Sequence, residues 1–117
     1  MQVLLIINDA PYGTEKAYNA LRLAMALQRE HDDVDVAIFL LADAVTSALP
    51  HQTTANGYYN IERMLRAVMN KGGSVKACGS CLQARGLADL PLLEGIESST
   101  MSQLARWVVD SDRVITF

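Results

Sequence analysis

The sequence contains few of the residues from which metal sites and disulfide frameworks are built. It has two histidines and two cysteines in 117 residues, and the cysteines, Cys78 and Cys81, lie together. His31 and His51 stand far apart, without the spacing of a zinc site, which needs about four ligands. We therefore expect no metal ion. A chain of this length buries a core without disulfides, so the two cysteines are not needed as staples.

Other absences limit the ligands and the cellular location. No apolar run approaches the ~18 residues of a membrane-spanning helix, and Met1–Ile7 lacks the basic leader of a signal peptide. We therefore expect a cytoplasmic protein with reduced thiols, outside any membrane. The net charge is −3 with scattered basic residues, so direct binding to nucleic acid is not expected. No Gly-x-Gly-x-x-Gly or Walker pattern occurs, and Gly13-Thr14 is too short for a phosphate cradle, so we expect no flavin or nucleotide cofactor.

The sequence does contain a regular alternation of two kinds of apolar segment. Half of the residues are hydrophobic and a fifth are charged, which indicates one folded domain over 1–117. Three stripes have helical spacing: Ala17, Ala20, Leu21, Ala24 and Met25; Ile61, Met64, Leu65, Val68 and Met69; Met101, Leu104, Ala105, Val108 and Val109. Thr14, Asn60 and Thr100 precede these stripes, and we expect them to be helix N-caps.

Short continuous apolar runs lie between the helical stripes. They cover Val3–Ile7, Val34–Ala42, Val75–Ala77 and Val114–Phe117, and Gly95–Glu97 adds a candidate fifth strand. Continuous rather than alternating runs are typical of strands covered on both faces. Strands that alternate with helices predict an α/β fold with a parallel sheet and right-handed crossovers. We expect a flavodoxin-like sheet of about five strands in the order 2-1-3-4-5, with helices on both faces.

The main candidate for chemistry is the segment Cys78-Gly79-Ser80-Cys81, which follows a predicted strand and opens a short helix. Free backbone amides at a helix start lower a cysteine pKa and favour a thiolate, which can take sulfur as a persulfide or attack a disulfide. Gly79 would let backbone approach the sulfur, and Ser80 would cap. Arg85 would either add positive charge or be simply solvated. Alternatively, Cys78 is a small buried hydrophobic residue, and Cys81 faces the core.

The predicted topology also singles out this place. Ligands of open parallel sheets bind where the strand order reverses, which in the expected order lies between the first and third strands. The segments that end those strands are Asn8–Gly13 and Cys78–Cys81. Asp9 or Tyr12, with neighbouring Asn8, could therefore tune the sulfur. Turn formation before Pro11 is the alternative for these residues.

Two further features leave alternatives open. The 50–60 segment is the one long irregular stretch, and it is either a connector or a functional lid or subunit-contact loop. Trp107 lies off the stripe of the last helix and is either partly buried or a contact for self-association.

A resemblance to a known family covers essentially the whole chain and rests on the start Val3–Gly13, the segment Val75–Gly86 and the ending Ser111–Phe117. On these residues the chain resembles the DsrE/DsrF-like family, and within it the YchN-type branch. The resemblance implies a flavodoxin-like domain assembled as a homohexamer, typically of two stacked trimers. In the sulfur-carrier members a persulfide forms on a cysteine eight residues before the glycine of an Arg-Gly pair, which corresponds to Cys78 counted from Gly86. Cys81 is an addition relative to the single-cysteine carriers.

These observations favour a cytosolic sulfur-transfer protein that hands sulfane sulfur between protein partners. Cys78 would be the persulfide carrier, and Cys81 a possible resolving thiol. One alternative is a non-catalytic hexameric assembly or binding module. The other is a thiol–disulfide redox protein that uses Cys78 and Cys81. Sulfur donor and acceptor proteins are the expected partners.

Overall fold

Strands and helices alternate along the chain in the computed structural model, which describes residues 1–117, without the side chain of residue 57. The strands are β1 (Gln2–Ile7), β2 (Asp35–Leu40), β3 (Ser74–Cys78), β4 (Glu97–Ser99) and β5 (Arg113–Thr116). The α-helices are α1 (Lys16–Glu30), α2 (Ile61–Asn70), α3 (Gly79–Ala84) and α4 (Met101–Asp110). Two 3-10 segments, η1 (Ala42–Ala48) and η2 (Ala55–Gly57), follow β2.

All five strands pair in parallel in one sheet, which confirms the predicted fold class. Their order is β4-β3-β2-β1-β5, so the expected order 2-1-3-4-5 is wrong. The first three crossovers all step in the same direction, and the order therefore reverses between β1 and β5. The right-handed rule fixes the face of the sheet on which a crossover helix lies once the step is known, but it does not fix the direction of the step.

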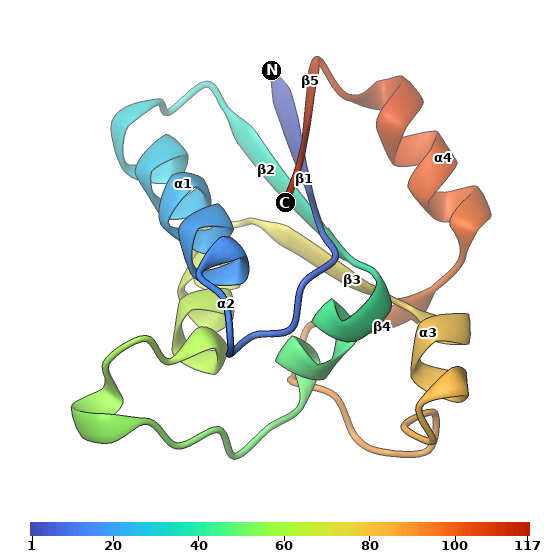
Figure 1. Ribbon diagram of the computed structural model, residues 1–117. Helices are drawn as coiled ribbons and strands as arrows, with labels where there is room; N and C mark the ends of the chain where they lie inside the picture. Colours follow the sequence, from blue (N-terminus) through green and yellow to red (C-terminus); the bar gives the residue numbers. More distant parts are fainter.

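The helices cover both faces of the sheet, as predicted. The crossovers from β1 to β3 place α1 and α2 side by side on one face, while the return from β4 to β5 carries α4 across the other (Figure 1). The short helix α3 lies beyond the carboxyl end of β3 and near η1. This arrangement leaves the carboxyl ends of β2 and β3 next to each other.

The core lies between the sheet and the first two helices. The stripes of α1 and α2 face inward as predicted, and β1 and β2 are almost wholly buried. Two expectations are wrong at the edge of the sheet that β5 forms. All four residues of β5 are exposed, and α4 buries only Leu104 of its predicted stripe, whereas Val109 is 78% exposed. β5 lies at the edge of the sheet and pairs with β1 alone, and α4 packs on the sheet through Leu104 and the half-buried Trp107.

The helix starts follow the predictions in two cases of three. Asn60 and Thr100 accept hydrogen bonds from the backbone N–H of Arg63 and Gln103, as N-caps do. The Thr14 prediction is wrong, because Glu15 is the N-cap of α1 and makes no side-chain cap bond. Over the part of the chain that the structure describes, no helix combines the length and apolar character needed to span a membrane.

Trp107 is half-buried within the monomer. Its ring packs edge-on against Phe39 of β2, with ring centroids 6.0 Å apart, and the Lys76 ammonium lies 5.7 Å from its centroid. These contacts explain why Trp107 departs from the apolar stripe of α4. They support the prediction of partial burial, while the alternative of self-association stays a prediction.

Candidate functional site

The two cysteines lie at the carboxyl edge of the sheet, where β3 ends and α3 begins. Cys78 is the last residue of β3 and the N-cap of α3, and Cys81 lies one turn into that helix. The start of η1, directly after β2, faces the same place because β2 and β3 are neighbours. Three segments therefore form the site: the end of β3, the first turn of α3 and the beginning of η1.

The Cys78 sulfur is held as a hydrogen-bond acceptor. The backbone N–H of Cys81 donates to it over 3.3 Å, and the Ser80 hydroxyl lies 3.3 Å away. Burial, with the residue only 5% exposed, raises the pKa of the Cys78 thiol. Hydrogen bonds from the Cys81 side chain, the Ser80 hydroxyl and the two backbone amides outweigh burial, so the pKa is lowered overall. The site therefore favours a thiolate at Cys78.

The pKa of the Cys81 thiol is shifted in the opposite direction. Burial and the hydrogen bond to Cys78 raise the pKa of the Cys81 thiol, and these effects outweigh the amide of Ala42 and the charge of Arg85. The Ala42 N–H donates to the Cys81 sulfur over 3.2 Å. Two thiols of equal intrinsic chemistry are thus made unequal by their surroundings, with Cys78 the more acidic.

Ala42 presents its N–H from an unusual backbone conformation. Its φ is +50°, a left-handed value that costs a residue with a Cβ about 1–2 kcal/mol. Hydrogen bonds hold the backbone on both sides, from Leu41 N–H to Ile7 O and from Ala44 N–H to Leu41 O, each at 2.9 Å. A strained residue that is fixed by its neighbours and aims an amide at a thiol is typical of a functional site.

Arg85 joins the two segments that flank Cys81. Its guanidinium contacts the Asp43 carboxylate with Nε at 2.9 Å and Nη2 at 2.8 Å, and its Nη1 donates to the Cys81 carbonyl over 3.0 Å. The sequence left Arg85 as either added positive charge or a solvated side chain, and the structure gives it this bridging position. Sequence reasoning missed Ala42 and Asp43. Their place directly after the second strand was the available signal, and it becomes useful only when β2 and β3 are known to be neighbours.

Gly79 meets β4 closely. A Cβ at this position would lie 2.8 Å from the Ser98 hydroxyl oxygen and 3.1 Å from the Ser99 carbonyl oxygen. The sequence suggested that Gly79 lets backbone approach the sulfur, whereas the structure shows that it also lets the edge strand approach α3. Ser80 is exposed, so the site opens to solvent beside that residue.

The three residues expected to tune the sulfur from β1 form their hydrogen bonds elsewhere. Asn8 donates to the Phe117 carbonyl, and Asp9 accepts from the Thr14 hydroxyl over 2.9 Å. Tyr12 donates to the Gln52 side-chain oxygen over 2.7 Å. The reason is the strand order: β2 lies between β1 and β3, so the segment after β1 is not next to the cysteines. The predicted coincidence of the cysteines with the strand-order reversal is therefore wrong.

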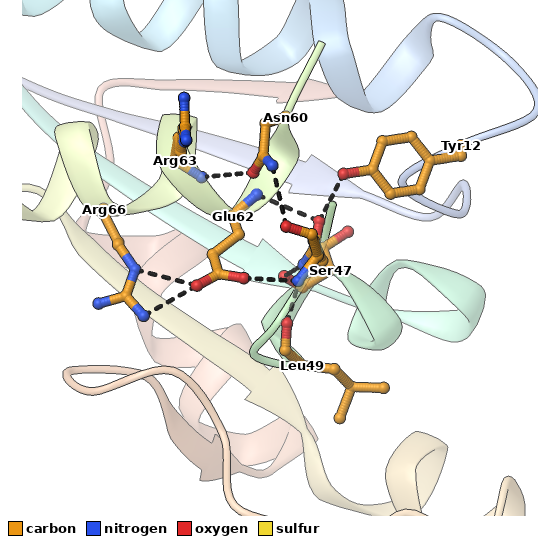
Figure 2. A network of polar contacts seen from close by, with 8 residues as sticks. Tyr12, Ser47, Leu49, Asn60, Glu62, Arg63 and Arg66 are labelled. Atoms are coloured by element: carbon orange, nitrogen blue, oxygen red, sulfur yellow. Dashed lines mark hydrogen bonds and ion pairs between the residues drawn. The ribbon is translucent and has the colours of Figure 1, made fainter. Parts of the chain in front are cut away.

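Tyr12 belongs to a second polar cluster, which anchors the 50–60 segment (Figure 2). The Gln52 side chain donates to the carbonyls of Ser47 and Leu49, and its main-chain N–H donates to the Glu62 carboxylate. Three residues of this segment have positive φ, namely His51, Asn56 and Tyr59. The cluster gives the segment a defined conformation, and sequence reasoning missed its central residue, Gln52, because an isolated glutamine carries no pattern.

Glu62 makes the stability of this cluster depend on pH. The Gln52 N–H and the Arg66 guanidinium lower the pKa of the Glu62 carboxyl, against the opposing effect of burial. A pKa that is lower in the folded state stabilises the fold above the unfolded-state value of about 4.5, and this stabilisation disappears as the pH falls through the folded-state pKa. Urea unfolding between pH 6 and 3 should show a smaller loss of stability for Glu62→Gln than for the wild type. An exposed carboxylate replaced in the same way, Glu94→Gln, should follow the wild-type curve.

The comparisons with known proteins agree over the whole chain. The DsrE/DsrF-like family model matches residues 1–117. Protein YchN of Escherichia coli strain K12 is 40% identical over 99% of this chain and 98% of its own length, and a crystal structure of the E. coli ychN protein superposes with a TM-score of 0.93 over 99% and 98% of the two chains. Sulfurtransferase TusD of Cronobacter sakazakii is 26% identical over the full length of both chains. The chain belongs to the DsrE/DsrF-like family.

Proposed function

We propose that this protein is a sulfur-transfer protein in which Cys78 carries sulfane sulfur as a persulfide and passes it between protein partners. The observation that carries the proposal is the surroundings of the Cys78 sulfur. It accepts hydrogen bonds at the first turn of α3, and they lower its pKa in spite of its burial. A thiolate is the form of cysteine that attacks a sulfur–sulfur bond.

The chemistry needs a donor protein that bears a cysteine persulfide. The Cys78 thiolate attacks the outer sulfur of that persulfide, and a new S–S bond forms at Cys78 as the donor S–S bond breaks. The electron pair of the broken bond leaves with the donor cysteine, which becomes a thiolate. The acceptor repeats the step on Cys78, so Cys78 returns to the thiolate and no other oxidant or reductant is consumed.

The relatives support a role in sulfur relay. The curated proteins named sulfurtransferase TusD match this chain from end to end at about a quarter identity. Relatives with that name make sulfur donor and acceptor proteins the partners to test first. The homohexamer expected from the sequence belongs to the same proposal. The exposed apolar side chains Val109, Met101 and Val114 on α4 and β5 offer surface for such contacts.

The test is mass spectrometry of the purified chain after incubation with a cysteine desulfurase and cysteine. We expect a mass increase of one sulfur atom that dithiothreitol removes, and that is absent from Cys78→Ser and retained by Cys81→Ser. Cys81→Ser is the matched control, because it also removes one thiol from the same turn. An adduct that persists in Cys78→Ser would refute the proposal. The absence of any adduct would favour an assembly or binding module.

A thiol–disulfide redox function is the second candidate, because both thiols lie within one helical turn and the Cys81 N–H already contacts the Cys78 sulfur. Oxidation in a series of glutathione buffers separates the two functions. A Cys78–Cys81 disulfide that forms near the cytosolic potential would favour the redox function. Failure to form the disulfide would exclude it.

A further inference from the structure

Cys81 is held at three points, and each holding group comes from a different part of the site. The Ala42 N–H reaches its sulfur at 3.2 Å, Arg85 reaches its carbonyl at 3.0 Å, and its own N–H contacts the Cys78 sulfur at 3.3 Å. The ion pair between Arg85 and Asp43 ties α3 to the residue that follows Ala42. We call Ala42, Asp43 and Arg85 the clasp.

We propose that the clasp positions Cys81 so that its thiol serves as a hydrogen-bond donor to the sulfur of Cys78. The proposal deepens the sulfur-transfer function above and rests on it for its purpose. A thiol sulfur that accepts the Ala42 N–H has its own proton free to point elsewhere. The Cys78 sulfur is close to residue 81, because it accepts the N–H of that residue over 3.3 Å. The Cys81 proton thereby joins the Cys81 N–H and the Ser80 hydroxyl as donors to one acceptor.

This position gives Cys81 a different role from that of a resolving thiol. A thiol that keeps its proton is a poor nucleophile, so attack by Cys81 on a persulfide at Cys78 is disfavoured. When an acceptor thiolate takes the outer sulfur, the S–S bond breaks and its electron pair returns to Cys78. These donors then stabilise the departing thiolate, and a better leaving group transfers sulfur faster. Cys81 acts on the reacting sulfur, whereas the clasp residues are positioning residues.

The backbone strain at Ala42 supports this assignment over a purely structural one. A glycine would adopt the left-handed φ of +50° without strain, yet the chain has a residue with a Cβ there, held by flanking hydrogen bonds on both sides. The amide is thereby fixed toward the Cys81 sulfur. The Asp43–Arg85 pair is partly exposed, with side chains 68% and 31% accessible, so we assign it position rather than stability.

The test compares two variants in which Cys78 is the only thiol. The rate of iodoacetamide alkylation is measured against pH in purified Cys81→Ser and Cys81→Ala, without any sulfur donor. The serine hydroxyl can donate to Cys78 and accept from Ala42, whereas alanine can do neither. We expect Cys78 in Cys81→Ala to react about fivefold more slowly near neutral pH, with its pH profile moved to higher pH, and Cys81→Ser to stay closer to the wild type. Identical profiles for the two variants would overturn the proposal.

The clasp is tested in the Cys81→Ser background by adding Arg85→Gln. We expect its pH profile to move part of the way toward that of Cys81→Ala, while Arg29→Gln, which removes an arginine from a distant exposed ion pair, should move nothing. If Arg85→Gln fails to fold, Asp43→Asn breaks the same ion pair from the other side. A profile unchanged by a folded clasp variant would show that the clasp does not position residue 81. Because no sulfur donor is present, these results stand apart from the persulfide test.

Discussion

Replacement of Phe39 by alanine should lower the free energy of unfolding by about 4 kcal/mol. Phe39 lies on β2, which is paired on both sides, and its side chain is 0% exposed. Its removal leaves a cavity between the sheet and α4, and the ring of Trp107 loses its edge-on partner. Backbone pairing with β1 and β3 prevents the strand from moving inward to fill the space, so the full cost of the cavity is retained.

Urea denaturation at one fixed protein concentration measures this effect as a lower midpoint with an unchanged slope. Tyr58→Ala is the matched control, because it also removes an aromatic ring, but from a side chain 68% exposed. We expect the control to change stability by less than about 0.5 kcal/mol. A loss below about 2 kcal/mol for Phe39→Ala would contradict the described packing.

The second large effect is expected at Gln52, where alanine should cost about 3 kcal/mol. The side-chain amide donates to Ser47 O at 2.8 Å and Leu49 O at 2.9 Å, and its oxygen accepts from the Tyr12 hydroxyl and the Glu62 N–H. At about 0.5–1 kcal/mol for each of these four hydrogen bonds, the loss is about 3 kcal/mol. The 50–60 segment should also become more accessible to protease, since three of its residues have positive φ and depend on this anchor.

For Gln52→Ala, the urea midpoint should therefore fall and the rate of limited proteolysis in the 50–60 segment should rise. Gln83→Ala provides the control, because Gln83 is exposed on α3 and the same atoms are removed. Gln52→Glu should be at least as destabilising as alanine at neutral pH, because its second carboxylate oxygen would face the two carbonyl oxygens. Its oxygen can still accept from Tyr12, but it cannot donate to the two carbonyls and it places a second carboxylate beside Glu62. Equal stability of Gln52→Ala and Gln83→Ala would show that the cluster does not anchor the segment.

Local patterns predicted the elements well where a pattern existed. Residue spacing predicted the apolar stripes of α1 and α2 and the positions of the strands. The N-caps Asn60 and Thr100 follow from hydrogen bonds between residues three apart. All of these signals lie within a short window of sequence. The stripe expected on α4 failed because apolar spacing shows which residues share a face and not whether that face is covered. The cluster around Gln52 was missed because an isolated glutamine carries no pattern and its Tyr12 partner lies in a distant part of the chain.

By itself the sequence determined that the chain forms an α/β domain and that the Cys78 sulfur lies where a strand meets a helix. Those conclusions depend on composition and on neighbours along the chain, which the sequence displays directly. Only the tertiary structure decided which segments face that sulfur, because strand order is a property of long-range packing. The start of η1 lies beside the cysteines, where the sequence had placed Asn8, Asp9 and Tyr12. Ala42 therefore contacts Cys81, and Asp43 contacts Arg85. Burial and the hydrogen bonds within the Cys78–Cys81 turn made the two cysteines unequal, with the pKa lowered at Cys78 and raised at Cys81.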